Sequence, residues 1–205
     1  MEKPYEMLLV GVGGQGILTI FKILGNAANE LDLACVGAET HGMSQRGGSV
    51  YVHLRIGGKE STAPLVLEGN ADLVVALEPA EALRFARYVH PERGTILTSS
   101  NIIEPSTLTL TRSDYPNVDA ILDALHQYTP TTYAADFRTP LESEKGTGVR
   151  SLNIAMLGAM SSLEGFPIPT DVLQQAIQDR YPKYWGSNKK AFDIGVEQFQ
   201  SLLSA

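Results

Sequence analysis

The sequence predicts an α/β fold, a mostly parallel sheet with helices on both faces and a helical C-terminal portion. Short segments rich in apolar and β-branched residues alternate along the chain with segments of helical length. Most of the strand-like segments are apolar throughout, which is typical of strands buried on both faces. A chain of 205 residues can be built around one core, so we expect a single domain over residues 1–205.

The first half of the chain contains the clearest strands. Residues 5–12 form an apolar run that leads into a glycine-rich turn, and residues 17–31 are apolar on most faces over helical length. Residues 33–39 are typical of a second strand. Residues 49–56 alternate between polar and apolar, which predicts a strand with one polar or partner-covered face. A Gly-Gly-Lys turn then leads to an expected return strand at residues 65–67.

The second half of the chain becomes increasingly helical. Further strands are expected at residues 72–78, 95–98, 107–111 and 131–135. Helices are expected at residues 79–89, 118–128, 149–163, 171–181 and 188–203. Pro79 suits the first position of its helix, whose inner face we assign to Leu83, Ala86 and Val89. Thr170 is expected to cap the helix that follows it.

The composition argues against several classes of function. The chain has 16 Lys and Arg against 23 Asp and Glu, and a net charge of −7 argues against nucleic acid or an anionic membrane as the main partner. The one cysteine, Cys35, cannot form an internal disulfide framework, and iron–sulfur clusters normally take four thiolates. No apolar run approaches 20 residues and no cleavable leader is recognisable, so we expect a cytoplasmic protein. Metal-ligand spacing is absent from the sequence.

The first motif lies between the first strand and the first helix. Gly11, Gly13 and Gly16 match the spacing of a dinucleotide-binding turn, so the fold is expected to be Rossmann-like. Such glycines permit a tight turn and leave amides free for a phosphate at the helix N-terminus. An acidic residue should end the second strand to bind a ribose, but Asp32 precedes that strand and Glu39 comes late. Phosphate contact and simple strand–helix packing both remain open.

The second motif is a polar, glycine-rich loop that runs from Glu39 to Ser49 between two expected strands. If the sheet is parallel, this loop emerges at the same edge as the first glycine loop, where ligands usually bind. Arg46 beside two glycines offers a guanidinium group and open amides to a phosphate or carboxylate. Two alternatives remain: a structural loop in which Arg46 pairs with Glu39, and a contact with another subunit. His41 has no matching nucleophile, so no catalytic residue is assigned.

Other titratable residues are interpreted as structural. The remaining histidines, His53, His90 and His126, are scattered, and Cys35 is expected to be a buried apolar residue. The acidic residues at positions 78 and 81 follow a strand and begin a helix, and their negative charges would stabilise the N-terminus of that helix.

Several stretches together resemble a known family. They are GVGGQGI at residue 11, ETHGMSQRGGSV at residue 39, ALEPAEALR at residue 76, LNIAMLGA around Asn153, and NKKAF followed by Gly195. In this order they resemble the small (beta) subunit of indolepyruvate:ferredoxin oxidoreductase, the gamma-type domain of the 2-oxoacid:ferredoxin oxidoreductases. The resemblance covers nearly the whole chain, and HGMSQRGGSV favours the indolepyruvate branch. Gly146-Thr147 departs from the family, where a Gly-Asn pair is expected.

The resemblance implies a role in the oxidative decarboxylation of an aryl 2-oxoacid to an aryl-acetyl-CoA, with electrons passed to ferredoxin. It implies that thiamine diphosphate and the iron–sulfur clusters are bound by a large (alpha) subunit, and that this chain alone holds no cofactor. Coenzyme A is the implied co-substrate. The resemblance also implies that residues of both glycine loops border the path of CoA or of the 2-oxoacid: Gly13, Gly14, Gln15, Gly16, His41, Gln45, Arg46, Gly47 and Gly48. Gly11 is added to this site because of the glycine spacing alone. The alternatives are a gamma subunit of a pyruvate- or 2-oxoglutarate-type enzyme, a free-standing NAD(P)-binding oxidoreductase, and a structural partner whose loops touch only protein.

Overall fold

The computed structural model describes residues 3–41, 48–58, 63–102 and 115–204. Its strands are β1 (Tyr5–Val12), β2 (Cys35–His41), β3 (Ser49–Ile56), β4 (Leu73–Ala76), β5 (Thr95–Ser99) and β6 (Thr131–Ala135). Its α-helices are α1 (Ile17–Glu30), α2 (Pro79–Phe85), α4 (Val118–Leu125), α5 (Arg138–Ser143), α6 (Leu152–Ser161), α7 (Thr170–Arg180) and α8 (Trp185–Leu203). Three short 3-10 turns complete the elements: η1 (Ala86–Tyr88), η2 (Val149–Ser151) and η3 (Pro182–Tyr184).

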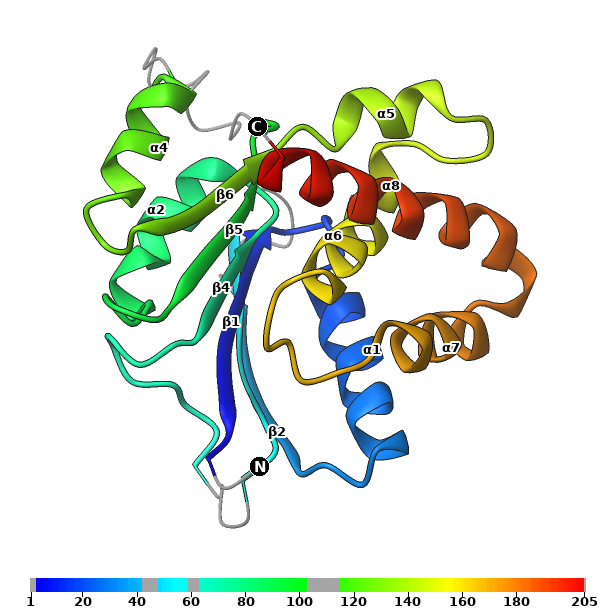
Figure 1. Ribbon diagram of the computed structural model, residues 1–205, viewed down its shortest axis with the longest axis horizontal. Helices are drawn as coiled ribbons and strands as arrows, with labels where there is room; N and C mark the ends of the chain where they lie inside the picture. Colours follow the sequence, from blue (N-terminus) through cyan, green and yellow to red (C-terminus); the bar gives the residue numbers. More distant parts are fainter. Residues whose placement is uncertain (1–2, 42–47, 59–62, 103–114, 205) are drawn as a thin grey trace.

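The strands form one mixed sheet in the order β2-β3-β1-β4-β5-β6 (Figure 1). Strands β1, β4, β5 and β6 are parallel neighbours, whereas β3 pairs antiparallel with both β1 and β2. Of the strands in the described ranges, five therefore point the same way and β3 points the other way. This confirms the α/β class, with a mostly parallel sheet and a helical C-terminal portion.

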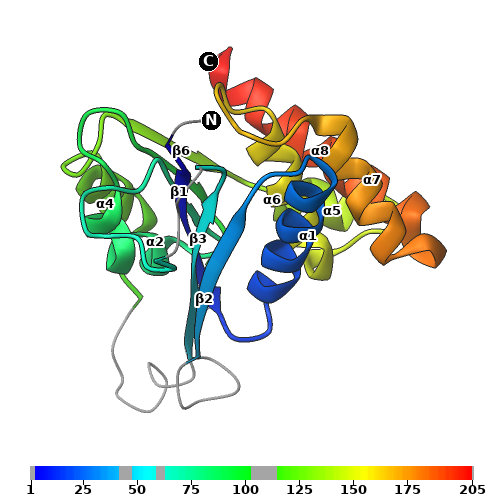
Figure 2. The same cartoon turned by 90° about the horizontal axis from the view of Figure 1, so that it is seen from below.

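Helices cover both faces of the sheet (Figures 1 and 2). Side chains alternate across β1, so Met7 and Leu9 pack against the layer formed by α1, α6, α7 and α8. Leu8 and Val10 pack on the opposite side, against α2 and α4. Because both faces are buried there, β1 from Met7 onward and β4 are apolar throughout, as the sequence predicted.

Several element predictions are wrong in detail. Residues 65–67 are not a strand: Val66 is buried, while Leu65 and Leu67 are exposed. The antiparallel neighbours of β3 are β1 and β2 instead. The expected helix at residues 79–89 is α2 followed by the 3-10 turn η1.

The inner face predicted for this helical segment is confirmed in part. Ala86 and Val89 are buried as predicted, whereas Leu83 is half-buried, and Ala82 and Phe85 also belong to the buried face. Two smaller predictions fail as well. Cys35 is half-buried at the start of β2, and the residue before α7 is Pro169, which provides no side-chain cap.

The C-terminal helices are packed unusually closely. Residues 152 to 160 of α6 are all buried, so this helix is enclosed on every side. Where α6 and α8 cross, a methyl group on Gly158 would lie 2.0 Å from the carbonyl oxygen of Phe192. One on Gly195 would lie 1.8 Å from the carbonyl oxygen of Ala155. Glycine at both positions therefore lets the two backbones touch.

None of the helices in the described ranges is long and apolar enough to cross a membrane. The expected strand at residues 107–111 lies outside the described residues.

Candidate functional site

The carboxyl edge of the sheet gathers the loops that the sequence singled out. Strand β1 ends at Val12, which is opposite Ser49, the first residue of β3, and β2 ends at His41, opposite Val50. The glycine loop after β1 and the loop between β2 and β3 therefore emerge side by side. The amide of Gly13 donates a hydrogen bond to the carbonyl oxygen of Gly48 at 2.8 Å and joins the two.

Gln15 holds the glycine loop in shape. Its Oε1 accepts a hydrogen bond from the Val12 amide at 2.6 Å, and its Nε2 donates to the Leu77 carbonyl at 2.9 Å. A methyl group on Gly11 would lie 2.7 Å from this Oε1, so glycine is needed there for the side chain to fold over β1. Gln15 thus ties the end of β1 to the end of β4.

Gly16 begins α1 in a conformation that favours glycine, with φ at 89°. A methyl group at this position would lie 2.5 Å from Nδ2 of Asn153, in the first turn of α6. The N-termini of α1 and α6 therefore meet at Gly16, and Asn153 is 8% exposed beneath them. This contact explains why two motifs far apart in the sequence belong to one site.

The glycine loop has fewer free amides than a dinucleotide site would use. The amide of Gly13 is bonded to Gly48, and that of Gln15 donates to the Val12 carbonyl at 3.1 Å. The neighbour of β1 on the β2 side is the antiparallel β3, so Glu39 pairs with Val52 of β3 and not with β1. Asp32 lies in the turn before β2. Neither acidic residue occupies the ribose position next to β1 that a dinucleotide fold requires.

Part of the second motif lies outside the described residues, namely Gln45, Arg46 and Gly47. The suggested Arg46–Glu39 ion pair therefore stays a prediction. His41 is the last residue of β2, and Gly48 is half-buried just before β3. The structure thus places both ends of this loop at the carboxyl edge.

A cavity of about 320 Å³ opens at the same edge beside Gln15. This is within the size range of small-molecule sites. Its walls are mainly apolar, with two amides and one guanidinium group; the lining residues are Gln15, Asn101, Ile102, Arg138, Leu141, Val149 and Leu152. Arg138 pairs with Glu142 through Nε at 3.0 Å, which leaves its other guanidinium N–H groups as donors for an anionic group. Together with the apolar walls, these donors suit a ligand with an anionic group and an apolar body.

The loop that presents Arg138 is held by Asp136 and Asn101. Asp136 Oδ1 accepts hydrogen bonds from Asn101 Nδ2 at 2.8 Å and from the amides of Arg138 and Thr139 at 2.9 and 3.1 Å. Burial alone would raise the pKa of Asp136, but the hydrogen bonds from Thr139 and Asn101 outweigh burial and lower it. The ionised carboxylate thus fixes the start of α5 at the rim of the cavity.

The sequence did not reveal the buried state of the two acidic residues after β4. Glu78 is 2% exposed and Glu81 is 6% exposed. Glu78 does cap α2, as its position at the strand end suggested, by accepting a hydrogen bond from the Glu81 amide at 3.0 Å. Burial raises the pKa of Glu78, and the charge of Glu81 adds to the shift. Two carboxylates three positions apart at a strand end are the sequence signal that could have suggested such a cluster.

The Gly146-Thr147 departure is accommodated locally. Thr147 Oγ1 lies 2.6 Å from the Leu141 carbonyl oxygen and 3.0 Å from that of Glu144, so its hydroxyl closes the turn after α5. Among the residues that the structure describes, no group of three or more His, Cys, Asp or Glu side chains could hold a metal ion.

Comparisons with known proteins agree with this architecture. An indolepyruvate oxidoreductase subunit, IorB, of Archaeoglobus fulgidus is 39% identical over 94% of both chains. Its namesake from Pyrococcus horikoshii is 34% identical over 98% of this chain and 99% of that one. In fold, the chain is similar to the gamma subunit of a keto/oxoacid ferredoxin oxidoreductase from Geobacter sulfurreducens, with a TM-score of 0.67, 23% identity, and coverage of 96% of this chain and 99% of that one. Residues 6–198 match the family described as pyruvate ferredoxin/flavodoxin oxidoreductase, and the chain belongs to that family.

Proposed function

We propose that this chain is the small subunit of a 2-oxoacid:ferredoxin oxidoreductase that acts on indolepyruvate or a related arylpyruvate. The observation that carries the proposal is the 34–39% identity, over nearly the full length of both chains, to subunits named for indolepyruvate. In the overall reaction the 2-oxoacid and CoA give the aryl-acetyl-CoA, carbon dioxide and a proton, and two electrons reduce ferredoxin.

The redox groups belong to a large subunit in this proposal. Thiamine diphosphate would supply the carbanion chemistry of decarboxylation, and iron–sulfur clusters would carry the electrons. The one cysteine of this chain supports the division, because Cys35 is half-buried and burial raises the pKa of its thiol. The small subunit would thus be inactive without its partner, in a cytoplasmic complex that uses ferredoxin, and would act as one domain over residues 1–205.

The carboxyl edge is the part of the small subunit that would meet the ligand. We assign the path of CoA or of the 2-oxoacid to the two glycine loops and the cavity beside Gln15. Arg138 would attract the carboxylate or a phosphate of the ligand, while the apolar walls would accept its uncharged part. Asp136, which does not line the cavity, would position Arg138 through its backbone amide, and Asn101 would do so from the cavity wall.

Activity of the complex tests the substrate class. The chain and a large subunit from the same organism would be co-expressed, purified together, and assayed for CoA-dependent ferredoxin reduction with indolepyruvate, pyruvate and 2-oxoglutarate. We expect the highest kcat/KM with indolepyruvate or another arylpyruvate. A preference for pyruvate or 2-oxoglutarate would move the chain to another branch of the family, and tight calorimetric binding of NAD or NADP by the chain would contradict the proposal.

Arg138 tests the assigned ligand path. We expect Arg138→Ala in the complex to raise the KM for CoA or for the arylpyruvate about tenfold, because one charge-assisted contact is lost. Arg93→Ala is the matched control: Arg93 is comparably exposed and also pairs with one carboxylate, that of Asp72, but it lies before β5 at the opposite edge of the sheet. Equal effects of the two substitutions would rule out a ligand contact at Arg138.

A further inference from the structure

The N-terminus of α2 holds two carboxylates that are almost fully buried, Glu78 and Glu81. Burying two negative charges one helical turn apart is costly unless each is well hydrogen-bonded. A helix cap requires one such side chain, and Glu78 alone provides it through the Glu81 amide. The burial of Glu81 therefore needs another explanation.

All four carboxylate oxygens of this pair are occupied. Glu78 accepts from the Tyr115 hydroxyl at Oε1 and from the Glu81 amide at Oε2. Glu81 accepts from the Ser49 hydroxyl at Oε2 and from Arg84 Nε at Oε1, the latter at 3.2 Å. The Tyr115 hydroxyl in turn accepts a hydrogen bond from the Ala80 amide at 3.1 Å, which orients its proton towards Glu78.

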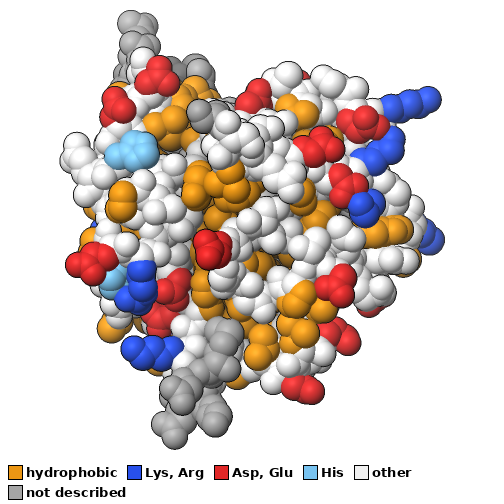
Figure 3. Space-filling view, in the orientation of Figure 1, with side chains coloured by type: hydrophobic (Ala, Val, Ile, Leu, Met, Phe, Trp, Pro, Cys, Tyr) orange, Lys and Arg blue, Asp and Glu red, His pale blue; other side chains and the backbone are white. Residues whose placement is uncertain are grey.

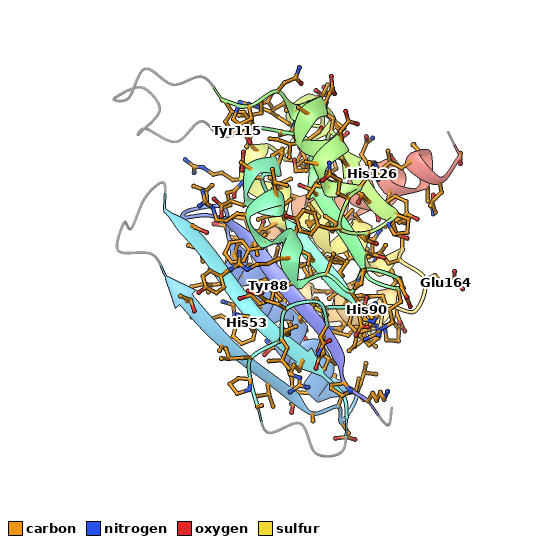
Figure 4. All side chains as sticks on the ribbon, turned by 90° about the vertical axis from the view of Figure 1, so that its left-hand side faces the viewer. His53, Tyr88, His90, Tyr115, His126 and Glu164 are labelled. Carbon is orange, nitrogen blue, oxygen red and sulfur yellow. The ribbon has the colours of Figure 1, made fainter. Side chains whose placement is uncertain are left out.

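The two distant donors both belong to segments at the ligand edge. Ser49 is 32 positions from Glu81 and opens β3 directly after the loop of the second motif. Tyr115 is 37 positions from Glu78 and precedes α4. Figure 4 shows Tyr115 near one end of α2, with Tyr88 and His53 near the other. The N-terminal end of α2 thus binds two chain segments that lie far apart in the sequence.

From this geometry we propose that Glu78 and Glu81 are positioning residues for the ligand edge. Glu81 holds the chain at Ser49 and thereby the exit of the ETHGMSQRGG loop, and Glu78 holds the chain at Tyr115. The carboxylates do not touch the ligand; they set the affinity of the loops that do. The role of the loops in ligand binding rests on the proposed function. The hydrogen bonds by which Glu78 and Glu81 hold Tyr115 and Ser49 in place do not.

Limited proteolysis measures directly how firmly the chain is held at Ser49 and Tyr115, because a trypsin site lies three residues before each of these hydrogen-bond donors. Arg46 precedes Ser49 and Arg112 precedes Tyr115 by that distance. In the full-length chain and in the complex, the initial rate of cleavage after each arginine would be followed by mass spectrometry. Loss of one hydrogen bond to a charged group increases local opening about tenfold. We expect Ser49→Ala to accelerate cleavage after Arg46 alone, and Tyr115→Phe to accelerate cleavage after Arg112 alone.

Two controls separate positioning from general destabilisation. Ser49→Thr keeps the hydroxyl and should restore the wild-type rate. Glu68→Gln removes a carboxylate from an exposed ion pair with Arg87, and should change neither rate. Wild-type rates in both Ser49→Ala and Tyr115→Phe would overturn the proposal, and so would equal acceleration at both arginines in every variant.

Steady-state kinetics of the complex test the consequence for the ligand. Glu81→Gln should raise the KM for CoA or the arylpyruvate about tenfold while kcat changes less than about twofold, since the lost contact is a positioning one. A fall in kcat at constant KM would contradict the role. If the complex has no oxidoreductase activity, the proposed function fails, but the proteolysis result still decides whether the two carboxylates hold the chain.

Discussion

His53 shows how one buried side chain can make stability depend on pH. It is 5% exposed on β3, and its ring meets those of Tyr51 and Tyr88 edge-on at 5.7 and 5.5 Å between centroids. Its Nδ1 accepts a hydrogen bond from the Val66 amide at 3.2 Å, which requires an unprotonated nitrogen. Burial lowers the pKa of His53, so the folded state favours the neutral ring.

The expected consequence is a loss of stability in mild acid. Below the ordinary histidine pKa of about 6.5, His53 is protonated in the unfolded chain but stays neutral in the folded chain. The free energy of unfolding therefore decreases as the pH is lowered. Asn places an acceptor near the position of Nδ1 and cannot titrate. Urea unfolding of the wild type and of His53→Asn at pH 7.5 and 5.5 should give a smaller decrease for the variant. Equal decreases would show that His53 does not cause the effect.

The burial of Glu78 and Glu81 could not be predicted from the sequence. The sequence indicated that both acids stand at a helix N-terminus, and Glu78 does cap α2. Their burial depends on Ser49 and Tyr115, which are more than 30 positions away in the chain. Pairings at such distances are set by the strand order, which local patterns do not encode.

At the scale of elements, the contact between α6 and α8 makes a sharp prediction. In Gly195→Ala the new methyl group would meet the Ala155 carbonyl oxygen at 1.8 Å, so the helices must separate. We expect the free energy of unfolding to fall by about 3 kcal/mol.

Gly186 provides the control within the same helix, because a methyl group there would have no atom within 4 Å. Gly186→Ala should raise stability by about 0.5 kcal/mol through the unfolded chain. Chemical denaturation of both variants checks the pair. Similar effects of the two substitutions would contradict the close crossing.

The short helix α5 was not predicted, and Asp136 explains why it forms. Six residues that include Pro140 carry little helical signal, and the first amides of the helix donate to the side-chain oxygens of Asp136 and Asn101. Because the pKa of Asp136 is lowered, its ionised form stabilises the fold above the ordinary Asp pKa.

Asp136→Ala should therefore cost about 1 kcal/mol at pH 7. The difference from wild type should shrink as the pH falls through the lowered pKa, where the wild-type carboxylate becomes protonated. Thermal unfolding at several pH values measures this difference. A difference independent of pH would mean that the charge of Asp136 is not involved.

Sheet topology was only partly predictable. Residues 5–12 coincide with β1, because a strand buried on both faces is marked by composition alone. Residues 131–135 coincide with the edge strand β6, whose β-branched residues predicted it. The alternation in β3 predicted a strand with one different face, and His53 and Arg55 do lie apart from the face of Val52 and Leu54. Its antiparallel insertion between β1 and β2 depends on long-range pairing and was not foreseen.

At the scale of the whole molecule, the surface carries exposed apolar side chains that a partner subunit would cover. Apolar side chains gather across the middle of the face in Figure 3, between the α2–α4 side and the α7–α8 side. Leu65 and Leu67 are 56% and 67% exposed. In the proposed function, the chain would supply the ligand edge, and its one cysteine fits redox groups that come from a partner.

The most direct test of this division of labour compares three preparations: the large subunit alone, this chain alone, and the two co-purified. The measurement is CoA-dependent ferredoxin reduction with indolepyruvate, together with the iron content of each preparation. We expect the two chains to elute as one complex that alone has full activity, with no iron in this chain. Full activity of the large subunit by itself, or iron-dependent activity of this chain by itself, would contradict the account.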